Sequence, residues 1–400
     1  MAHSGETSTH GGRGLRKLSG VLLPKKQVYL DWNATTPPLT RVIEAMVAAA
    51  NEAWANPSSL HTFGRTARAR VEDAREAVAR LAQCDPRDVV LTSGGTEANN
   101  LALRSAFPRA DGHPGVLATS RLEHPSVTRV AEALEHEGRA RVRWIRVRPD
   151  GTIDVEDVAR ALAERDVRLL AVQAINAETG VVQPVLDVIG LARQAGVRVH
   201  VDAVQAFGRV EDVAVHADTR SLAAHKIRGP KSIGALIARP GVAIEPLLMG
   251  GTQERGVRPG TTDPVAAAGL AAAARHAAHS ATQWQSTAPL RDALESGLLR
   301  LARGARVNGI HAQRAPHVAS ITFPGWPGPE LVAALDLEGV GVSSGTACSA
   351  GTSEPSPVLV AMGDPEGARC TVRFSLGEDT TREDVECALA AAARVLARKA

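Results

Sequence analysis

The sequence predicts an α/β fold in which a large, mostly parallel sheet is followed by a smaller α+β domain. From about residue 88 to 240, short runs rich in β-branched residues alternate with segments whose apolar residues recur every three to four positions. After Asp263 the pattern changes to alanine-rich helical stretches followed by strand-like runs. The chain has 400 residues, 44% hydrophobic and 22% charged, which suffices for two globular domains.

The elements follow one another in the order expected of such a fold. In the first part, strands are expected at 89–92, 116–119, 142–147, 169–175 and 197–202. The segments 125–136, 154–165 and 186–195 have the periodicity and length of crossover helices that cover the faces of a sheet. In the second part, helices are expected at 264–279 and 288–303, and strands at 319–323, 340–344 and 370–376.

Residues 1–27 carry no such pattern. They are rich in glycine, serine, histidine and basic residues, so we expect a disordered extension. The apolar run at 21–23 is too short for a signal-peptide core. The basic residues leave an organelle transit peptide as an alternative, although such a peptide should have a longer amphipathic pattern. The sequence contains no run of about 18 apolar residues, so no membrane span is expected.

The charge and the cysteines exclude several classes of protein. With 46 basic and 43 acidic residues, a net charge of +3 provides no broad electrostatic footprint for nucleic acid or an anionic membrane. The cysteines form no CxxC pair, so neither a zinc site nor a disulfide framework is expected of Cys84, Cys348, Cys370 and Cys387. We therefore expect a cytoplasmic protein without a metal site and without direct nucleic-acid binding.

A glycine-rich turn follows the first predicted strand. In the motif at 93–97, Gly94 and Gly95 allow a tight turn whose backbone N–H groups point outward, at the start of a helix. Such a turn holds a phosphate, and the Thr96 hydroxyl adds a donor. An ordinary strand-to-helix turn with Thr96 as the N-cap explains this motif alone equally well.

An acid and a lysine follow in chain order. Asp202 ends a predicted parallel strand, where α/β proteins bind ligands, and a carboxylate there keeps a pyridine nitrogen protonated. Gln205 follows three residues later. Lys226, chosen over Lys231, is an amine that forms a Schiff base with an aldehyde when burial and nearby positive charge remove its proton.

A histidine completes the constellation. His124 follows the strand at 116–119, and its imidazole is suited to stacking on a ring and moving protons near neutral pH. Each of these residues has a commonplace explanation by itself, as a helix cap, a loop residue or a surface lysine. Together they require an aldehyde, a pyridine and a phosphate on one small molecule, and pyridoxal 5′-phosphate (PLP) has all three.

With these residues in place, the chain resembles the cysteine desulfurases of the NifS/IscS type. These enzymes belong to the class V aminotransferase superfamily and have the PLP-dependent transferase fold type I. The resemblance runs from about Val28 to the C-terminus, and its markers are the motifs at 29–37, 56–59, 92–97, 200–205, 225–231, 256–261 and 373–377.

The segment at 343–349, followed by 354–356, is similar to the cysteine loop of the group I desulfurases. By resemblance, Cys348 is a catalytic residue on a mobile loop that receives sulfur from L-cysteine as a persulfide, with release of L-alanine. Its Ser, Gly and Thr neighbours fit a thiolate that has to move. Cys84, Cys370 and Cys387 are instead expected to be small buried residues.

The resemblance also implies the roles of the cofactor residues. Lys226 bonds to PLP, Asp202 pairs with the ring nitrogen and Gln205 contacts the phenolic oxygen. His124 lies on the ring and, with Lys226, moves protons. Phosphate contacts are implied for Gly95, Thr96 and His225.

Further implications concern the substrate, the assembly and the domains. Asn33 and Arg373 bind the substrate carboxylate, and Thr261 reaches the phosphate of the neighbouring subunit in a homodimer with shared active sites. A sulfur-acceptor protein is implied, as is a supply of sulfur for iron–sulfur clusters or thiolated products. The implied domains are a segment joining the small domain at 28–36, a PLP-binding domain at 37–283 and a small domain carrying the cysteine loop at 284–400.

Two positions depart from the family pattern. Ala177 stands where the family has an asparagine that contacts the cofactor ring, with Asn176 one place early, and Ala223 replaces a serine that contacts the phosphate. Two alternatives therefore stay open. One is a related PLP enzyme, a selenocysteine lyase or an aminotransferase-like catalyst, in which Cys348 is incidental; the other is a non-catalytic scaffold.

Overall fold

The computed structural model of the protein describes residues 27–108, 112–210, 214–345 and 355–398. The expected disordered extension at 1–27 lies outside these residues except for Gln27, and so does Cys348. No helix in the described part of the chain has the length and apolar character needed to cross a bilayer.

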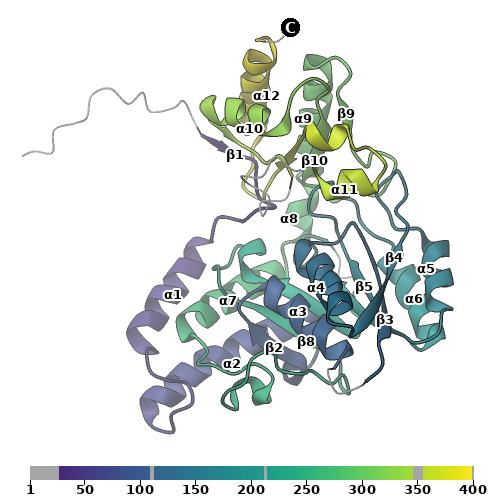
Figure 1. Cartoon of the computed structure of the whole chain (residues 1–400). Helices are drawn as coiled ribbons and strands as arrows, with labels where there is room; N and C mark the ends of the chain where they lie inside the picture. Colours follow the sequence, from purple (N-terminus) through teal and green to yellow (C-terminus); the bar gives the residue numbers. More distant parts are fainter. Residues whose placement is uncertain (1–26, 109–111, 211–213, 346–354, 399–400) are drawn as a thin grey trace, which may run out of the picture.

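The larger part of the molecule is built on a seven-stranded sheet (Figure 1). Its strand order is β2-β8-β7-β6-β5-β3-β4, and only β8 runs antiparallel to its neighbours. The mostly parallel sheet is therefore confirmed. The strands are β2 (Val89–Thr92), β3 (Gly115–Ser120), β4 (Ala140–Ile145), β5 (Val167–Gln173), β6 (Arg198–Asp202), β7 (Thr219–Ala223) and β8 (Gly234–Ala238).

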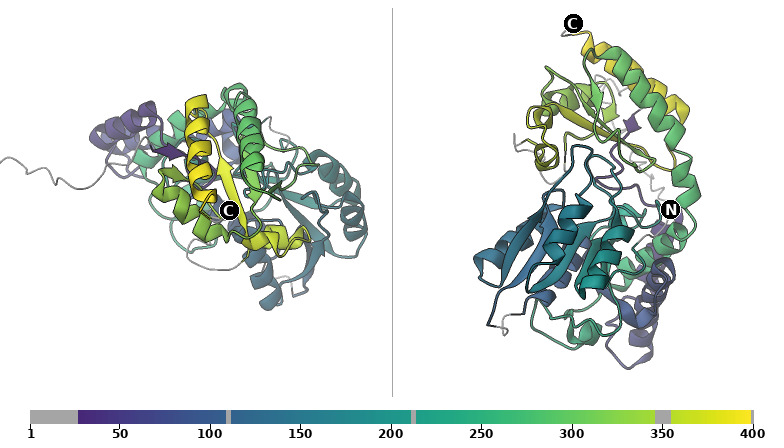
Figure 2. Two further views of the ribbon diagram at one scale, coloured as in Figure 1. Left: turned by 90° about the horizontal axis from the view of Figure 1, so that it is seen from above. Right: turned by 90° about the vertical axis from the view of Figure 1, so that its right-hand side faces the viewer.

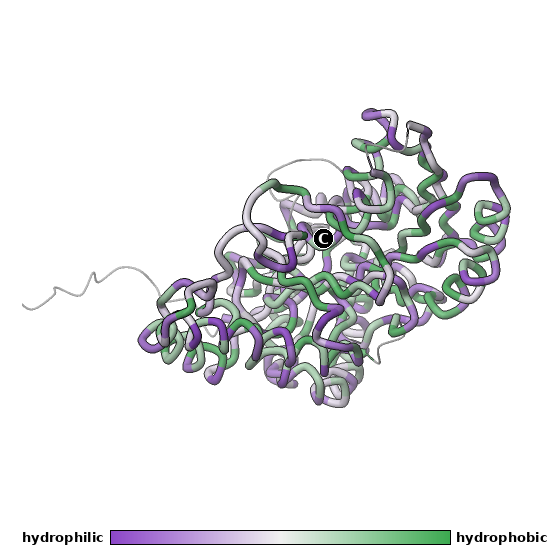
Figure 3. Tube along the Cα trace, turned by 90° about the horizontal axis from the view of Figure 1, so that it is seen from below, coloured by the Kyte–Doolittle hydropathy of each residue, from purple (hydrophilic) through white to green (hydrophobic). Residues whose placement is uncertain are grey.

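Helices cover both faces of this sheet, because alternate residues of each strand point to opposite sides. Val90 and Leu169 pack with the cluster around α3 and α4, whereas Leu91 and Leu170 pack with the cluster around α2, α5, α6 and α7. Along the helices, hydrophilic and hydrophobic residues alternate (Figure 3). The helices of this part are α1 (Thr40–Glu52), α2 (Thr62–Ala82), α3 (Gly95–Ala106), α4 (Pro125–His136), α5 (Val155–Leu162), α6 (Val185–Ala195) and α7 (Pro264–Ala277).

The smaller part lies at one end of the large sheet (Figure 2). An antiparallel sheet in the order β12-β10-β9 packs against helices around a second core that includes Leu298, Ile321 and Phe374. Its elements are α8 (Ala281–Gln285), α9 (Ala288–Leu301), β9 (Arg306–Val307), β10 (Val318–Thr322), α10 (Gly328–Leu337), α11 (Pro357–Ala361), β12 (Thr371–Ser375) and α12 (Arg382–Leu396).

The N-terminal segment joins this smaller part. β1 (Val28–Tyr29) pairs in parallel with β11 (Val340–Gly341), and Leu30 lies in the second core. Val318 and Met362, although they follow residue 284, pack in the main core. The two parts are thus in continuous contact, and the domain boundaries inferred from the sequence stay predictions.

Several elements differ from the sequence-based expectation. β7, β8, α1 and α2 were not predicted, and the strand expected at 340–344 is only the two-residue β11 followed by an isolated bridge between Ser343 and Arg373. β8 pairs β2 with β7, which are far apart in the chain, so no local pattern specifies its neighbours.

Candidate active site

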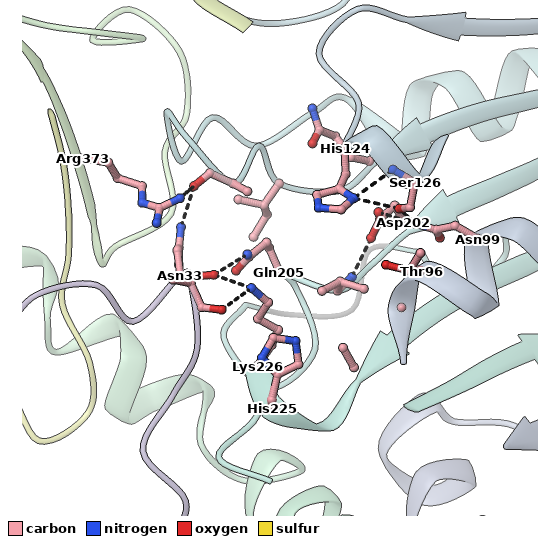
Figure 4. A pocket seen from close by; sticks show the side chains of 17 residues that line it. Asn33, Thr96, Asn99, His124, Ser126, Asp202, Gln205, His225, Lys226 and Arg373 are labelled. Carbon is pink, nitrogen blue, oxygen red and sulfur yellow. Dashed lines mark hydrogen bonds between the residues drawn. The ribbon is translucent and has the colours of Figure 1, made fainter. Parts of the chain in front are cut away.

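A cavity of about 210 Å³ opens at the carboxyl edge of the large sheet (Figure 4). The edge collects functional residues because β5, β6 and β7 are parallel, so their carboxyl ends lie together. Nine of the eleven residues predicted from sequence line this one cavity: Asn33, Gly95, Thr96, His124, Asp202, Gln205, His225, Lys226 and Arg373.

The glycine turn and the start of α3 form one end of the cavity. Gly94 is the N-cap residue, with φ of 149°, and no side chain caps the helix. The alternative in which Thr96 is an ordinary N-cap is therefore wrong: Thr96 lies inside α3 and lines the cavity. Gly95 has a packing requirement as well, since a Cβ there would lie 2.6 Å from Val204 Cγ2. The uncapped helix terminus provides N–H donors for an anion.

His225 borders the same part of the cavity as a neutral donor. Burial, with added repulsion from Lys226, lowers the pKa of His225 to about 3. Its Nδ1 lies 3.2 Å from the hydroxyl of Thr35. The neutral His225 ring therefore adds no charge to the cavity.

Asp202 ends β6 as a carboxylate that accepts several hydrogen bonds. Asn99 Nδ2 donates to Oδ2 at 2.8 Å, while the backbone N–H of Val204 and the Ser221 hydroxyl donate to Oδ1 at 3.0 and 3.2 Å. Donors on both oxygens fix the orientation of the carboxyl group. Asp202 thus presents a carboxyl group of fixed orientation to the cavity.

A hydrogen-bonded chain behind Asp202 escaped the sequence-based reasoning. His200 Nε2 lies 2.9 Å from Asn99 Oδ1, and His200 Nδ1 lies 2.9 Å from Thr219 Oγ1. Burial lowers the pKa of His200 to about 4, so its ring is neutral and donates from Nε2 to Asn99. The spacing of these residues in the sequence indicates a shared location. His200 lies two residues before Asp202 and so on the same face of the strand, and Asn99 lies one helical turn after Thr96.

His124 is both the N-cap of α4 and a cavity residue. Its Nδ1 accepts from the Ser126 backbone N–H at 3.1 Å and lies 2.8 Å from the Ser126 hydroxyl. Burial lowers the pKa of His124, so the neutral ring carries its proton on Nε2. Nε2 is therefore the atom from which His124 can deliver a proton.

Lys226 closes a single 3-10 turn, Ala224–Lys226, directly after β7. Its Nζ donates to the carbonyl oxygens of Asn33 at 2.5 Å and Ala34 at 2.8 Å. Lys231 is exposed and does not line the cavity. The structure therefore brings Lys226, and not Lys231, together with the other predicted residues.

Asn33 and Arg373 converge from opposite ends of the chain. Asn33 Nδ2 and an Arg373 guanidinium nitrogen both donate to the carbonyl oxygen of Ala177, each at 3.0 Å (Figure 4). Arg373 also pairs with Asp31 at 2.6 Å and is 2% exposed. Two donors from separate elements meeting at one oxygen form an arrangement that suits a carboxylate.

The neighbouring asparagine does not replace the missing side chain at Ala177. Asn176 Oδ1 accepts from the backbone N–H groups of Glu178 and Thr179, and its Nδ2 donates to the Leu122 carbonyl. These bonds close a turn, and Asn176 does not line the cavity. Ala223 does line it, without a polar atom in its side chain.

Two predicted residues are not among those that line the cavity. Thr261 is exposed and does not line the cavity of its own chain, and Cys348 lies outside the described residues. The residues that flank the undescribed segment do lie beside the cavity residues. Ser343 exchanges backbone hydrogen bonds with Arg373, and the Ser356 hydroxyl donates to Glu178 at 2.5 Å.

Comparison with known proteins gives consistent results. Residues 28–387 match the aminotransferase class-V family model. An "IscS-like cysteine desulfurase" of Mycobacterium tuberculosis is 39% identical over 90% of this chain and 94% of that protein. A solved "NifS-like protein" has a TM-score of 0.86 at 32% identity and covers 93% of this chain and all of its own. A structure titled "SspA in complex with cysteine" has a TM-score of 0.77 at 31% identity, with coverages of 87% and 98%.

One cavity thus holds a carboxyl group, a lysine, a histidine and an uncapped helix start, and the family match extends over residues 28–387. The chain belongs to the aminotransferase class-V family, among the relatives named cysteine desulfurases.

Proposed function

We propose that the protein is a PLP-dependent cysteine desulfurase that moves the sulfur of L-cysteine to Cys348 and releases L-alanine. The observation that carries this proposal is the convergence of nine sequence-predicted residues on one cavity. Their chemistry is that of the family to which the chain belongs.

The residues of the cavity fit the three functional groups of PLP. The uncapped N-terminus of α3, with Gly95, Thr96 and His225, suits a phosphate. Asp202 suits a protonated ring nitrogen, and Lys226 suits an aldehyde carbon. When bound, PLP supplies an electron sink that stabilises negative charge on the carbon next to the substrate amino group.

The remaining steps belong to the protein. Lys226 Nζ would hold the cofactor covalently and would also provide an amine base within the cavity. His124 donates a proton from Nε2, since its Nδ1 is already engaged with Ser126. Asn33 and Arg373 exchange the Ala177 carbonyl for the carboxylate of L-cysteine, which orients the substrate.

The sulfur step is balanced without a further reactant. The Cys348 thiolate attacks the sulfur of L-cysteine, and an S–S bond forms while the C–S bond of L-cysteine breaks. The electron pair of the broken C–S bond passes to carbon. Carbon then takes up a proton, so the products are the Cys348 persulfide and L-alanine. The residues on either side of the undescribed segment support this role. Ser343 is hydrogen-bonded to the cavity residue Arg373, and Ser356 is hydrogen-bonded to Glu178, which follows the cavity residue Ala177.

The experiment that tests the function compares the purified protein with and without L-cysteine. We expect visible absorbance from bound PLP, a spectral change on adding L-cysteine, and equal amounts of L-alanine and sulfide when a thiol reductant is present. A colourless protein would establish the scaffold alternative. Turnover of L-selenocysteine without turnover of L-cysteine would establish the lyase alternative.

A homodimer with shared active sites is the assembly that we propose. Trp54 and Phe63 are 67% and 60% exposed, with ring centroids 5.7 Å apart, and Met249 is 88% exposed. An ion pair at 2.7 Å joins α2 to Glu254, so the segment holding Met249 and Thr261 passes beside α2. Exposed aromatic residues are typical of interface centres.

Changing Trp54 and Phe63 together to serine should weaken the dimer, because each aromatic side chain buries roughly 150–250 Å² in a contact. Light scattering of the variant at micromolar concentration should give half the molar mass of the parent. Leu337→Ser, at an 81% exposed position on α10, is the matched control and should stay dimeric. A parent protein that is itself monomeric would refute the shared site.

The sulfur acceptor and the compartment follow from the chemistry of a persulfide. We propose an acceptor protein that takes sulfur from Cys348 for iron–sulfur clusters or thiolated products. A reduced cysteine is needed to attack the persulfide, so the cytoplasm is the compartment that we propose.

A further inference from the structure

Arg209 is a buried cation beside the candidate active site that no role described above uses. It follows Gln205 by four residues in a turn after β6 and is only 1% exposed. Its guanidinium lies 4.7 Å from the centre of the Trp284 ring. It donates to the Lys226 carbonyl at 2.9 Å and to the Trp32 carbonyl at 3.4 Å. It thus contacts the cavity residues from behind.

The Glu378 carboxylate attracts this positive charge without forming a direct ion pair with it. Among the residues that the structure describes, no aspartate or glutamate forms an ion pair with Arg209, and its Nε has no hydrogen-bond partner. Burial lowers the pKa of Arg209 to about 9, which still leaves it charged at neutral pH. A buried charge without a direct ion pair is costly, and an anionic ligand in the cavity, beyond Asn33 and Gln205, would reduce that cost.

The hydrogen bonds of Arg209 determine how two amides are turned. One of its terminal nitrogens donates to Asn33 Oδ1 at 2.9 Å and to Gln205 Oε1. That nitrogen has two hydrogens, so both are used, and His317 Nε2, 3.2 Å away, receives none. Since burial lowers the pKa of His317 well below its usual value, the neutral ring donates from Nε2 to Asn33 Oδ1 at 3.0 Å.

With their oxygens held, the amides have their N–H groups on the other side. Asn33 Nδ2 donates to the Ala177 carbonyl, and Gln205 Nε2 donates to the Asn33 carbonyl at 3.2 Å. Both residues line the cavity. A flipped amide would place its NH2 group against the guanidinium, which is itself a donor, and would present an acceptor where an anion needs a donor.

We propose that Arg209 is a positioning residue that keeps Asn33 and Gln205 turned as donors and supplies the positive charge that an anionic ligand in the cavity neutralises. The inference rests on the proposed function, because PLP and L-cysteine are the anions concerned. His317 assists by donating to the same Asn33 oxygen.

The test measures PLP binding to the apoprotein and the rise in melting temperature that PLP produces, for the parent protein, R209M, R209K and R139M. We expect R209M to raise the PLP dissociation constant at least about tenfold and to shrink the melting shift. R139M removes a largely buried arginine that is paired with Glu137 at the end of α4 opposite His124 and does not line the cavity. This control variant should lower the melting temperatures measured with and without PLP and leave the difference between them unchanged.

R209K separates charge from orientation. Lysine keeps the charge but lacks the planar fork that holds two amide oxygens. We expect it to recover most of the PLP affinity while the KM for L-cysteine stays raised about tenfold and kcat falls less. If R209M does not fold, the test uses R209K alone. A raised KM for L-cysteine with nearly parental PLP affinity is then the expected result.

The outcomes distinguish this inference from the function on which it rests. A parent protein that binds no PLP or does not convert L-cysteine overturns the proposed function, and the role of Arg209 with it. A parent enzyme that is active, together with an R209M variant of unchanged PLP affinity and unchanged melting shift, overturns the role of Arg209 alone.

Discussion

Changing Lys226 to alanine should reduce the release of L-alanine and sulfide from L-cysteine by at least about 10⁴-fold, the order of loss expected when a covalent catalytic group is removed. Lys226 lies directly after β7, and its Nζ donates to the carbonyl oxygens of Asn33 and Ala34 in the cavity. Without it, the cofactor has no covalent attachment and the cavity loses an amine base. Product assays, and the absorbance that remains after dialysis, measure the two losses separately.

Lys231→Ala is the control for this change. Lys231 lies five residues further along the same segment, but it is exposed and does not line the cavity. The control should retain both activity and bound cofactor. Full activity in the Lys226→Ala variant, or an equal loss in the Lys231→Ala variant, would contradict the assignment of Lys226.

Changing Cys348 to serine should abolish sulfide release while the absorbance of bound cofactor stays that of the parent. A hydroxyl cannot attack sulfur and carry it as a persulfide, because only the thiolate is a sulfur nucleophile. The cofactor is proposed to be held by Lys226, Asp202 and the turn before α3, and none of these is altered. Sulfide and L-alanine assays, with persulfide labelling of the protein, check this result.

Cys387→Ser provides the matched control, since Cys387 lies on α12 against the second core, away from the cavity residues. It should keep sulfide release and the persulfide label. If the Cys348→Ser variant continues to release sulfide from L-cysteine, the persulfide role is wrong, and the related-enzyme alternative with an incidental Cys348 takes its place.

Much of the fold and of the candidate site was readable from local patterns. The strands ending at Thr92 and Asp202, and the helix Pro125–His136, are where the periodicity placed them within a few residues. Strand ends and glycine turns are local features, and the carboxyl edge of a parallel sheet brings them together. The roles of these residues in catalysis stay predictions, whereas their convergence on one cavity is observed.

What the sequence by itself determined was therefore the fold class, the family, and the order of turn, histidine, acid and lysine along the chain. The tertiary structure decided how distant residues complete the site. Asn33 and Arg373 meet at the Ala177 carbonyl, and Arg209 and His317 hold Asn33 from behind. These residues come from both ends and the middle of the chain, so their contacts depend on long-range packing of the two cores, which no local period encodes.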